Sequence, residues 1–333
     1  MKAAVLMRYG KAPYAVQVTD VRDPEVGPRD VLVRVRAAGV NPLDTMIARK
    51  EVSLLVGYRT PLVMGNELAG EVEAIGAEVT RVRVGQRVMC RMPLNRIGAF
   101  AEYAVVDQDA LAPIPDAYSF EEAAAVSLTA LTAMQALDLL AGAGEGDSVF
   151  ISGGTGSLGA TAIPLAAARG LQVITSGNAR HEQRVRELGA TRFIDYRSQD
   201  YADVLRDIDF VIDSLGGREV DRQLGIMRSG GTLVSLRGGP NGEFARRAGY
   251  GPLKRALFTL AGTRVDRAAA KRGQRYRFVF VHSDGAQLER AATILVERGV
   301  PAQVGQILPL AQVSEALARV DAGGACGKVV VTP

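Results

Sequence analysis

Several residue types are scarce in this 333-residue sequence, which contains two cysteines, two histidines and no tryptophan. The two cysteines, Cys90 and Cys326, argue against a disulfide framework, and we expect both to be small buried apolar side chains in a reducing compartment. No window approaches the roughly 20 uninterrupted apolar residues that a membrane-spanning helix needs, so we expect no membrane partner. The stretch Met1–Arg8 lacks the apolar core and cleavage site of a signal peptide, which predicts a cytoplasmic protein.

The net charge of +4 is unevenly distributed along the chain. The segment 244–277 carries ten lysines and arginines against a single acid, Asp266. A basic block of this kind can attract nucleic acid or an anionic cofactor. A solvated helical face explains it more simply, and we favour that interpretation.

The predicted secondary structure changes from strands to helix near residue 120. Before that point, short stretches such as Val31–Arg36, Leu68–Ile75 and Gln86–Cys90 alternate or cluster apolar residues between Gly, Pro and Asp turns, which predicts strands. Ser119 and Glu122 have the spacing of a capping box, and an Ala-rich helix is expected to follow to about Leu140.

From residue 148 onward, strand patterns alternate with helical ones, which predicts an α/β fold with a doubly wound parallel sheet. The expected strands are 148–152, Leu171–Thr175, Arg192–Ile194, Asp209–Asp213, Gly231–Ser235 and Tyr276–Val281. Further helices are expected at 285–298 and about 311–321, and a last strand at Lys328–Val331. At 333 residues, two domains are expected.

A glycine turn between the first of these strands and its helix is the strongest functional signal. Gly153, Gly156 and Gly159 lie three residues apart, directly after the apolar strand. Glycine allows the backbone to turn sharply and to approach a pyrophosphate, whose charge then lies at the helix N-terminus. The position between strand and helix predicts a dinucleotide site.

Taken together, the motifs resemble the medium-chain dehydrogenase/reductase superfamily, within it the zinc-free quinone oxidoreductase and alkenal (enone) reductase branch. The motifs are Ala37–Asp44, Met64–Gly70, Val84–Val88, Ile97–Tyr103, Ser127–Leu131, the glycine turn, Phe210–Gly217 and Gly327–Val331. The resemblance implies a GroES-like, β-rich catalytic domain (1–121, completed by 299–333) and a Rossmann NADP-binding domain (122–298), with the active site in the cleft.

The same resemblance indicates that zinc is absent. Zinc-dependent relatives have a Cys-His pair where this chain has Asn41-Pro42, and a histidine where it has Asn66. A catalytic zinc needs about three Cys, His or carboxylate ligands. Both histidines, His181 and His282, lie in or near the predicted nucleotide domain, so we expect no metal site.

The end of the second Rossmann strand indicates NADPH. A carboxylate there would bind the ribose hydroxyls and repel a 2′-phosphate, but Thr175–His181 offers hydroxyl, amide and guanidinium groups instead. By resemblance, Ser176, Arg180 and Tyr196 are expected at the 2′-phosphate, with His181 as an alternative to Arg180. The other expected cofactor residues are Thr129, Gly153, Gly154, Thr155, Gly156, Ser157, Leu158, Asn178, Gly216, Gly238 and Lys328.

Without a metal, hydrogen-bond donors must polarise the acceptor. Hydride transfer to a quinone or an enone spreads charge over a phenolate or an enolate, which neutral donors can stabilise. We expect Asn41 to be the main polar contact, although it could equally stabilise the turn before Pro42. Tyr58 is a second possible donor, although packing is its simpler role, and Met46 is expected to line an apolar substrate pocket.

The predicted function is therefore an NADPH-dependent reductase of quinones or α,β-unsaturated carbonyl compounds. An enoyl reductase of a natural-product or fatty-acyl pathway is the alternative. A non-catalytic NADPH-binding or nucleic-acid-binding protein is the alternative of another class, although nucleic acid is the less favoured partner. By resemblance, the strand 276–281 is expected to form a homodimer edge. Pro164 is expected to kink or locally open its helix.

Overall fold

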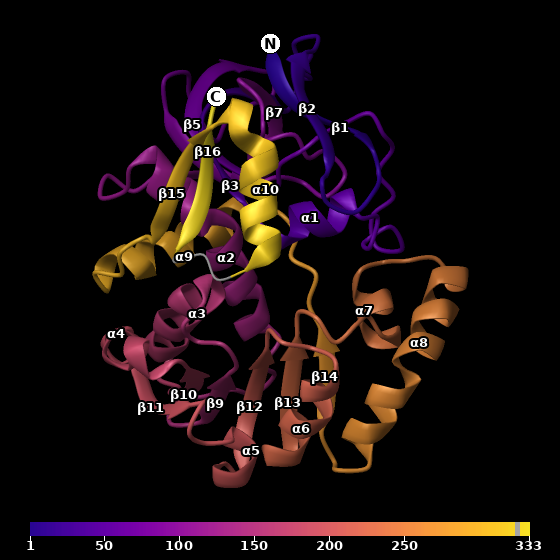
Figure 1. Cartoon of the computed structure of the whole chain (residues 1–333), viewed down its shortest axis with the longest axis vertical. Helices are drawn as coiled ribbons and strands as arrows, with labels where there is room; N and C mark the ends of the chain where they lie inside the picture. The colour runs from indigo at the N-terminus through magenta and orange to yellow at the C-terminus, as the bar shows by residue number, and fades with distance from the viewer. Residues whose placement is uncertain (324–326) are drawn as a thin grey trace. The chain divides into compact units, whose positions relative to one another are not determined.

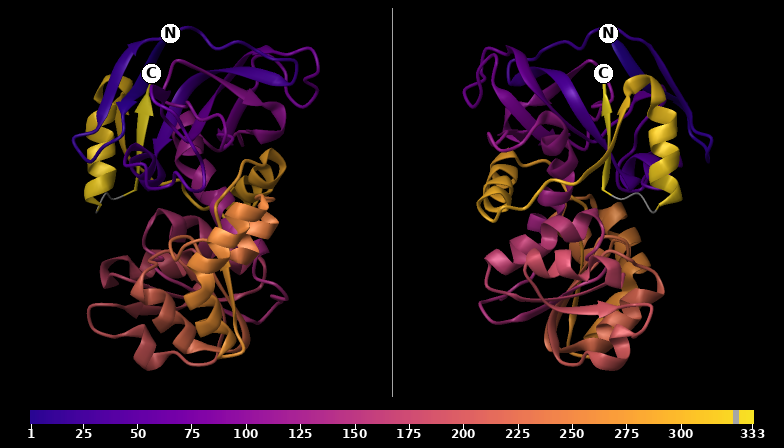
Figure 2. Two further views of the ribbon diagram at one scale, coloured as in Figure 1. Left: turned by 90° about the vertical axis from the view of Figure 1, so that its right-hand side faces the viewer. Right: turned by 60° about the vertical axis from the view of Figure 1, so that its left-hand side comes forward.

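The computed structural model describes residues 1–323 and 327–333. The chain forms two compact units, one of Met1–Leu131 with His282–Pro333 and one of Thr132–Val281 (Figures 1 and 2). These bounds differ from the expected 121/122 and 298/299, because much of α2 and all of α9 belong to the first unit. Cys90 is buried, whereas Cys326 lies outside the described residues.

The first unit is built from two sheets. The smaller has the order β2-β1-β4, and the larger has the order β15-β16-β3-β5-β6-β8, with β7 also paired to β3. Its strands are β1 (Lys2–Arg8), β2 (Ala15–Asp20), β3 (Asp30–Val40), β4 (Leu62–Val63), β5 (Glu67–Ile75), β6 (Arg87–Arg91), β7 (Tyr103–Asp107), β8 (Leu111–Pro113), β15 (Val304–Pro309) and β16 (Lys328–Thr332). Antiparallel pairing of β16 with β3 joins the two ends of the chain in one domain.

Four helices accompany these strands: α1 (Pro42–Ala48), the start of α2 (Phe120–Asp138), α9 (Gly285–Glu297) and α10 (Val313–Ala322). The predicted capping box is confirmed at the start of α2. The Glu122 N–H donates to Ser119 Oγ (3.2 Å), and the Ser119 N–H donates to Glu122 Oε2 (2.8 Å). These reciprocal bonds satisfy backbone donors that the first helical turn leaves unpaired.

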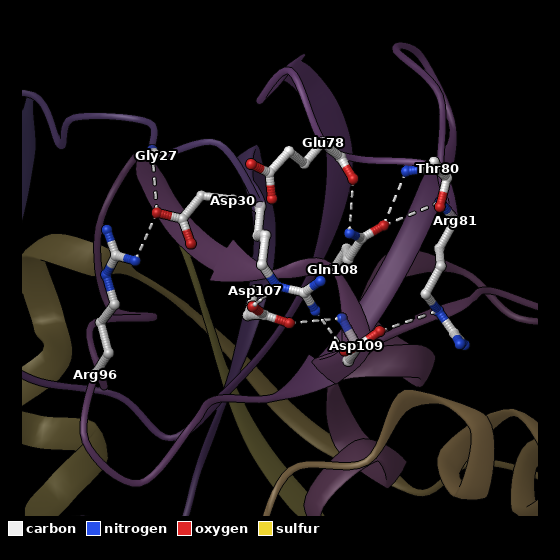
Figure 3. Close-up of polar contacts among 10 residues, drawn as sticks. Gly27, Asp30, Glu78, Thr80, Arg81, Arg96, Asp107, Gln108 and Asp109 are labelled. Atoms are coloured by element: carbon white, nitrogen blue, oxygen red, sulfur yellow. Dashed lines mark hydrogen bonds and ion pairs between the residues drawn. The ribbon is translucent and has the colours of Figure 1, made fainter.

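A buried glutamine holds one group of loops in the first unit (Figure 3). Gln108, in the short 3₁₀ turn Gln108–Ala110, accepts from the N–H groups of Thr80 (2.9 Å) and Arg81 (3.1 Å). Its Nε2 donates to the Glu78 carbonyl (3.0 Å). Nearby, Asp30 accepts from Arg96 (2.8 Å). A single amide thus replaces the backbone partners that this loop lacks.

The second unit is a parallel sheet with the strand order β11-β10-β9-β12-β13-β14. Its strands are β9 (Ser148–Ile151), β10 (Gln172–Gly177), β11 (Ala190–Asp195), β12 (Ile208–Asp213), β13 (Met227–Ser235) and β14 (Arg275–Phe278). Its helices are α3 (Ser157–Ala168), α4 (Glu182–Glu187), α5 (Tyr201–Val204), α6 (Arg218–Ile226), α7 (Gly242–Arg247) and α8 (Pro252–Ala270). This is the order of a Rossmann fold, so the predicted fold class is confirmed.

The sequence made specific predictions for two segments of the second unit, the helix that contains Pro164 and the basic segment 244–277. α3 runs unbroken through Pro164, so the predicted opening of the helix is wrong. The basic segment 244–277 folds as the helices α7 and α8 followed by β14, as the solvated-helix interpretation required. No helix among residues 1–323 and 327–333 is long and apolar enough to cross a bilayer.

Candidate functional site

The glycine turn connects β9 to α3 in the second unit, and each glycine there has a separate steric reason. Gly153 adopts a φ of 71°, which L-residues rarely adopt. A Cβ on Gly154 would lie 2.0 Å from Thr175 Oγ1, and one on Gly159 would lie 2.3 Å from the Gly154 carbonyl. Gly156 caps α3, whose first turn contains no acidic residue. The turn therefore leaves backbone N–H groups and a positive helix end available to an anion.

Three other residues of this turn were expected at the coenzyme, and their role stays a prediction. Thr155 and Leu158 are half-buried, and Ser157 is exposed at the first position of α3. The Gly154 N–H donates to the Ser176 carbonyl (3.1 Å), which ties the turn to the end of β10.

The side chains expected at the 2′-phosphate gather at the ends of β10 and β11. Ser176 pairs in register with Ile194, and the Tyr196 N–H donates to the Gly177 carbonyl (3.2 Å), so Ser176 and Tyr196 end neighbouring parallel strands. Arg180 follows in the 3₁₀ turn Ala179–His181, and its N–H donates to Asn178 Oδ1 (3.2 Å). Arg180 and Tyr196 are exposed, so both are accessible to a ligand.

Arg180 Nε donates to His181 Nε2 (2.9 Å), so the two candidates are in contact, and His181 stays an alternative to Arg180. The two alternatives considered from the sequence thus form one group. As the acceptor of this bond, the His181 ring orients the guanidinium.

Sequence reasoning missed the residue that shapes the other two glycine loops. Asp213, fully buried at the end of β12, accepts from the Gly216 N–H (3.0 Å) and from Ser235 Oγ (2.6 Å). Ser235 Oγ in turn accepts from the Gly238 N–H (2.6 Å). Asp213 therefore fixes both loops at the carboxyl edge of the sheet, where ligands of open α/β sheets bind. The sequence signal for this role was an acidic residue, Asp213, at the end of the apolar strand β12.

Substitution of the turn glycines should separate folding from coenzyme binding. Gly156→Ala should fold normally, since its φ is −86° and a Cβ would lie 3.4 Å from the Gly153 carbonyl. It should still weaken NADPH binding, because the added methyl group occupies the space that the pyrophosphate needs. Gly154→Ala should lower stability by roughly 2 kcal/mol or more through overpacking against Thr175. Urea denaturation and coenzyme titration of both variants measure the difference, and equal effects would contradict the assignment.

In the first unit, buried polar side chains surround Glu67. Glu67 is the first residue of β5, and its Oε1 accepts from Lys328 Nζ (2.6 Å) and from Asn41 Nδ2 (2.7 Å). Its Oε2 accepts from the Leu128 N–H of α2. Gly39 allows this close approach, since a Cβ there would lie 2.3 Å from Glu67 Oε1. The network joins β3, β5, α2 and β16.

This network corrects two expectations. Asn41 donates to Glu67 and to the Gly39 carbonyl (3.2 Å), and its Oδ1 accepts from Lys328. Both amide hydrogens are therefore committed, and Asn41 is not a donor to substrate in this arrangement. The Lys328 ammonium is bound by Glu67 and Asn41 instead of being presented to a coenzyme. Thr129 is buried in α2, and its hydroxyl donates to the Val126 carbonyl (3.1 Å).

A second buried carboxyl, Asp44, adjoins the network. It accepts from the Asn41 N–H (2.8 Å) and from Asn66 Nδ2 (2.7 Å). Burial raises the pKa of Asp44 to about 7, although both hydrogen bonds favour the charged form. Asn66 Oδ1 has no partner among the described residues. A 180° turn of the Asn66 amide would let this oxygen accept from a protonated Asp44, so both forms of the carboxyl can be satisfied.

Stability should therefore depend on the protonation of Asp44. Its folded-state pKa lies above that of the unfolded chain, so the stability it contributes is present below about pH 4 and is lost as the pH rises through 7. Asp44→Asn, which cannot ionise, should remove this part of the dependence. Urea unfolding at pH 5 and pH 8.5 should show wild type losing a few kcal/mol relative to the variant, since one pKa unit is about 1.4 kcal/mol. Parallel pH profiles would contradict a buried, titrating Asp44.

Tyr58 and Met46 complete the expected acceptor residues. The half-buried Tyr58 donates through its hydroxyl to the Leu94 carbonyl (2.7 Å). Burial raises the pKa of Tyr58 to about 12, so the hydroxyl stays protonated at neutral pH. Met46 is half-buried on α1, and its thioether offers no strong hydrogen bond.

Sequence reasoning also missed Arg91, the last residue of β6. Its side chain is fully buried, pairs in register with Glu67, and donates to the Met92 carbonyl. Nε and Nη2 have no partner among the described residues. Burial lowers the pKa of Arg91 to about 10, which still leaves it cationic at neutral pH. The signal was an arginine directly after the apolar residues Val88–Cys90.

The residues at the positions of the zinc ligands in zinc-dependent relatives do not fit a metal ion. The amide nitrogens of Asn41 and Asn66 are used as donors to carboxylates, and burial raises the pKa of the Cys90 thiol far above neutrality. A thiolate is the form that zinc binds. Among the described residues, no group of three or more His, Cys, Asp or Glu side chains could hold a metal.

Comparison with known proteins assigns this arrangement to a family. Residues 27–116 match the alcohol dehydrogenase GroES-like domain, and residues 188–331 match the zinc-binding dehydrogenase family. The quinone oxidoreductase of Pseudomonas aeruginosa is 34% identical over 235 residues, covering 68% of this chain and 70% of that protein. The chain belongs to the medium-chain dehydrogenase/reductase superfamily. Membership makes it an oxidoreductase that uses a nicotinamide coenzyme.

Two further relatives align with the whole length of this chain. The mitochondrial NAD(P)H oxidoreductase RTN4IP1 of Danio rerio is 29% identical over 354 residues, covering 100% of this chain and 91% of that protein. The structure of the quinone oxidoreductase from Coxiella burnetii aligns with a TM-score of 0.84 at 26% identity, covering 100% and 99% of the two chains. The predicted resemblance to quinone oxidoreductases is therefore confirmed.

Proposed function

We propose that this oxidoreductase transfers hydride from NADPH to quinones or α,β-unsaturated carbonyl compounds without a metal. The observation that carries the proposal is the buried network of Asn41, Asn66 and Glu67. Where zinc-dependent relatives have metal ligands, Asn41 and Lys328 bond to Glu67, and Asn66 bonds to Asp44.

The choice of NADPH rests on the ends of β10 and β11. Ser176 lies near the end of β10, and Asn178 and the exposed Arg180 follow the strand, with no carboxylate among residues 176–181 to repel a 2′-phosphate. When bound, the coenzyme supplies the hydride. The start of α3 would hold its pyrophosphate, and Arg180 with Tyr196 would hold the 2′-phosphate.

The choice of acceptor follows from the charges of the first unit. Hydride addition to an isolated ketone concentrates charge on one alkoxide oxygen, whereas a quinone or an enone delocalises it. Tyr58 keeps its proton, and its hydroxyl can turn from the Leu94 carbonyl to donate to such an oxygen. Lys328 is balanced by Glu67, so Arg91 leaves this buried region net positive whenever Asp44 is protonated. A positive region lowers the energy of a delocalised oxyanion without a metal.

Coenzyme oxidation by the purified protein tests the proposal. NADPH and NADH are each followed by absorbance with a quinone, a short enone and an enoyl thioester. We expect turnover of the first two with NADPH, at a rate unaffected by a chelator. Activity confined to the enoyl thioester would favour the enoyl reductase alternative. Coenzyme binding without turnover of any acceptor would favour a non-catalytic protein.

We also propose that the enzyme is a cytoplasmic homodimer. β14 is the last strand in the sheet order, so its outer edge is the one expected to pair with a second copy. Light scattering should give twice the mass of the 35.3 kDa chain. A monomer at micromolar concentration would overturn this part of the proposal.

A further inference from the structure

The helix α8 has one face packed on its own unit. Its buried residues are Phe258, Gly262 and Ala269, which lie on one side of the helix. Gly262 packs so closely that a Cβ would lie 2.4 Å from Asn241 Cβ. The orientation of the helix is therefore fixed, and the side chains opposite these residues face outward.

The outward face begins with three leucines. Leu253, Leu257 and Leu260 are 85%, 45% and 76% exposed. Their spacing of four and three residues places them on one side of the helix, opposite Phe258. Single exposed leucines need no explanation, but three adjacent ones form an apolar patch of the kind that marks an interaction site.

Basic residues continue the same line. Arg264, Arg267 and Lys271 follow Leu260 at intervals of four, three and four residues, and all three are exposed. We call these three residues with the three leucines the outer stripe of α8. Other basic residues of the segment lie off this line: Lys254 Nζ lies over the Tyr250 ring, and Arg247 donates to the Phe278 carbonyl (2.6 Å).

Few acids balance this charge. Among the described residues, Arg264 pairs with Asp221 (3.1 Å), and Arg247 pairs with Glu243 (3.5 Å). The acid of α8, Asp266, accepts from the buried Asn241. The helix therefore presents leucines and positive charge together, as helices that lie on anionic membrane surfaces do.

We propose that the outer stripe of α8 binds the surface of a bilayer that contains anionic lipids. The leucines enter the boundary between headgroups and acyl chains, and the basic residues contact lipid phosphates. This inference stands independently of the proposed function, and it replaces the expectation of no membrane partner. It concerns a surface contact, since α8 does not span a bilayer.

Other occupants fit the stripe less well. A nucleic acid would bind the arginines and lysines but has no use for three adjacent leucines. A second copy docked through the same stripe would bring like charges together. Three leucines also fall far short of the roughly 800 Å² per partner that a stable interface buries.

Vesicle sedimentation of the full-length protein tests this inference. The probes are vesicles of equal parts phosphatidylcholine and phosphatidylglycerol, and vesicles of phosphatidylcholine alone. We expect binding to the anionic vesicles at low salt, with a strong reduction at high salt and for the neutral vesicles. Leu253→Ser/Leu257→Ser/Leu260→Ser should weaken binding by about 100-fold. Arg267→Gln/Lys271→Gln should weaken it about fivefold per charge.

Matched variants outside α8 are the controls. Arg192→Gln/Arg197→Gln removes two charges at the β11 edge, which is opposite to β14 in the sheet order, and Val84→Ser removes an exposed apolar side chain. Both should bind as wild type does. Circular dichroism and NADPH binding verify that each variant folds.

Several results would overturn the proposal: no binding to anionic vesicles, equal binding by the α8 variants, or equally salt-sensitive binding to single-stranded RNA. Loss of a dimer in the leucine variant without loss of vesicle binding would also do so, because it would assign the leucines to a second copy. NADPH turnover of quinones is measured separately, so failure of this proposal leaves the proposed function untouched.

Discussion

Arg180→Ala is expected to raise the KM for NADPH by about 10- to 100-fold while leaving the KM for NADH unchanged. A hydrogen bond to a charged group contributes about 1.5–3 kcal/mol, which corresponds to this range. The guanidinium is exposed and oriented by His181, so its loss should not disturb the fold. Steady-state kinetics with both coenzymes measures the change, and kcat should stay within about twofold because a binding contact is removed.

The control is Arg275→Ala, which removes another exposed arginine of the same sheet. Arg275 begins β14 and donates to Thr232 Oγ1 (3.1 Å) and the Gly230 carbonyl (3.0 Å). It lies at the start of its strand, away from the carboxyl edge where the coenzyme is expected. An equal rise in the KM for NADPH in both variants would show that the effect is one of general charge.

Glu67→Gln is expected to lower the free energy of unfolding by about 3–5 kcal/mol, because it leaves the Lys328 ammonium buried without its counter-charge. The amide must also turn a donor toward either Lys328 or the Leu128 N–H, both of which are donors. The double variant Glu67→Gln/Lys328→Met should recover part of the loss, since it removes both charges. Urea denaturation measures each value.

Glu71→Gln is the matched control on the same strand. Glu71 pairs with Arg36 (2.6 Å) at the surface, with both side chains more than a third exposed. Exposed ion pairs contribute about 0–1 kcal/mol, so this variant should unfold almost as wild type does. Equal losses for the Glu67 and Glu71 variants would mean that Glu67 is not held in a buried pair.

The local elements of the fold were predictable, whereas their assignment to units was not. The period of α9 correctly places a helix at 285–298, but it shows only which face is buried and not what covers it. A Cβ on Gly285 would lie 2.0 Å from the Leu111 carbonyl, so the start of α9 packs on β8 of the first unit. Such a contact joins residues about 170 positions apart and leaves no mark in a local pattern.

The candidate site divides in the same way. The glycine turn and the polar end of β10 are local, so the spacing could predict Gly153 and the resemblance could predict Ser176 and Arg180. The hydrogen-bond partners of the Asn41 amide include Lys328, which is 287 positions away in the sequence. Only the pairing of β16 with β3 brings these two residues together. The burial of Arg91 was not predicted, because strand alternation indicates which face of the sheet a side chain is on but not whether a charged side chain there is paired.

The most direct test of the central claim compares an enone with the saturated ketone of the same carbon skeleton. The claim is that a buried positive region around Arg91, in place of a metal, restricts hydride transfer to acceptors that delocalise the added charge. With NADPH and in the presence of a chelator, kcat/KM should be at least about 1000-fold higher for the enone, since loss of one strong oxyanion interaction already costs 100- to 1000-fold. Comparable turnover of the saturated ketone, lost on chelation and restored by zinc, would contradict the account.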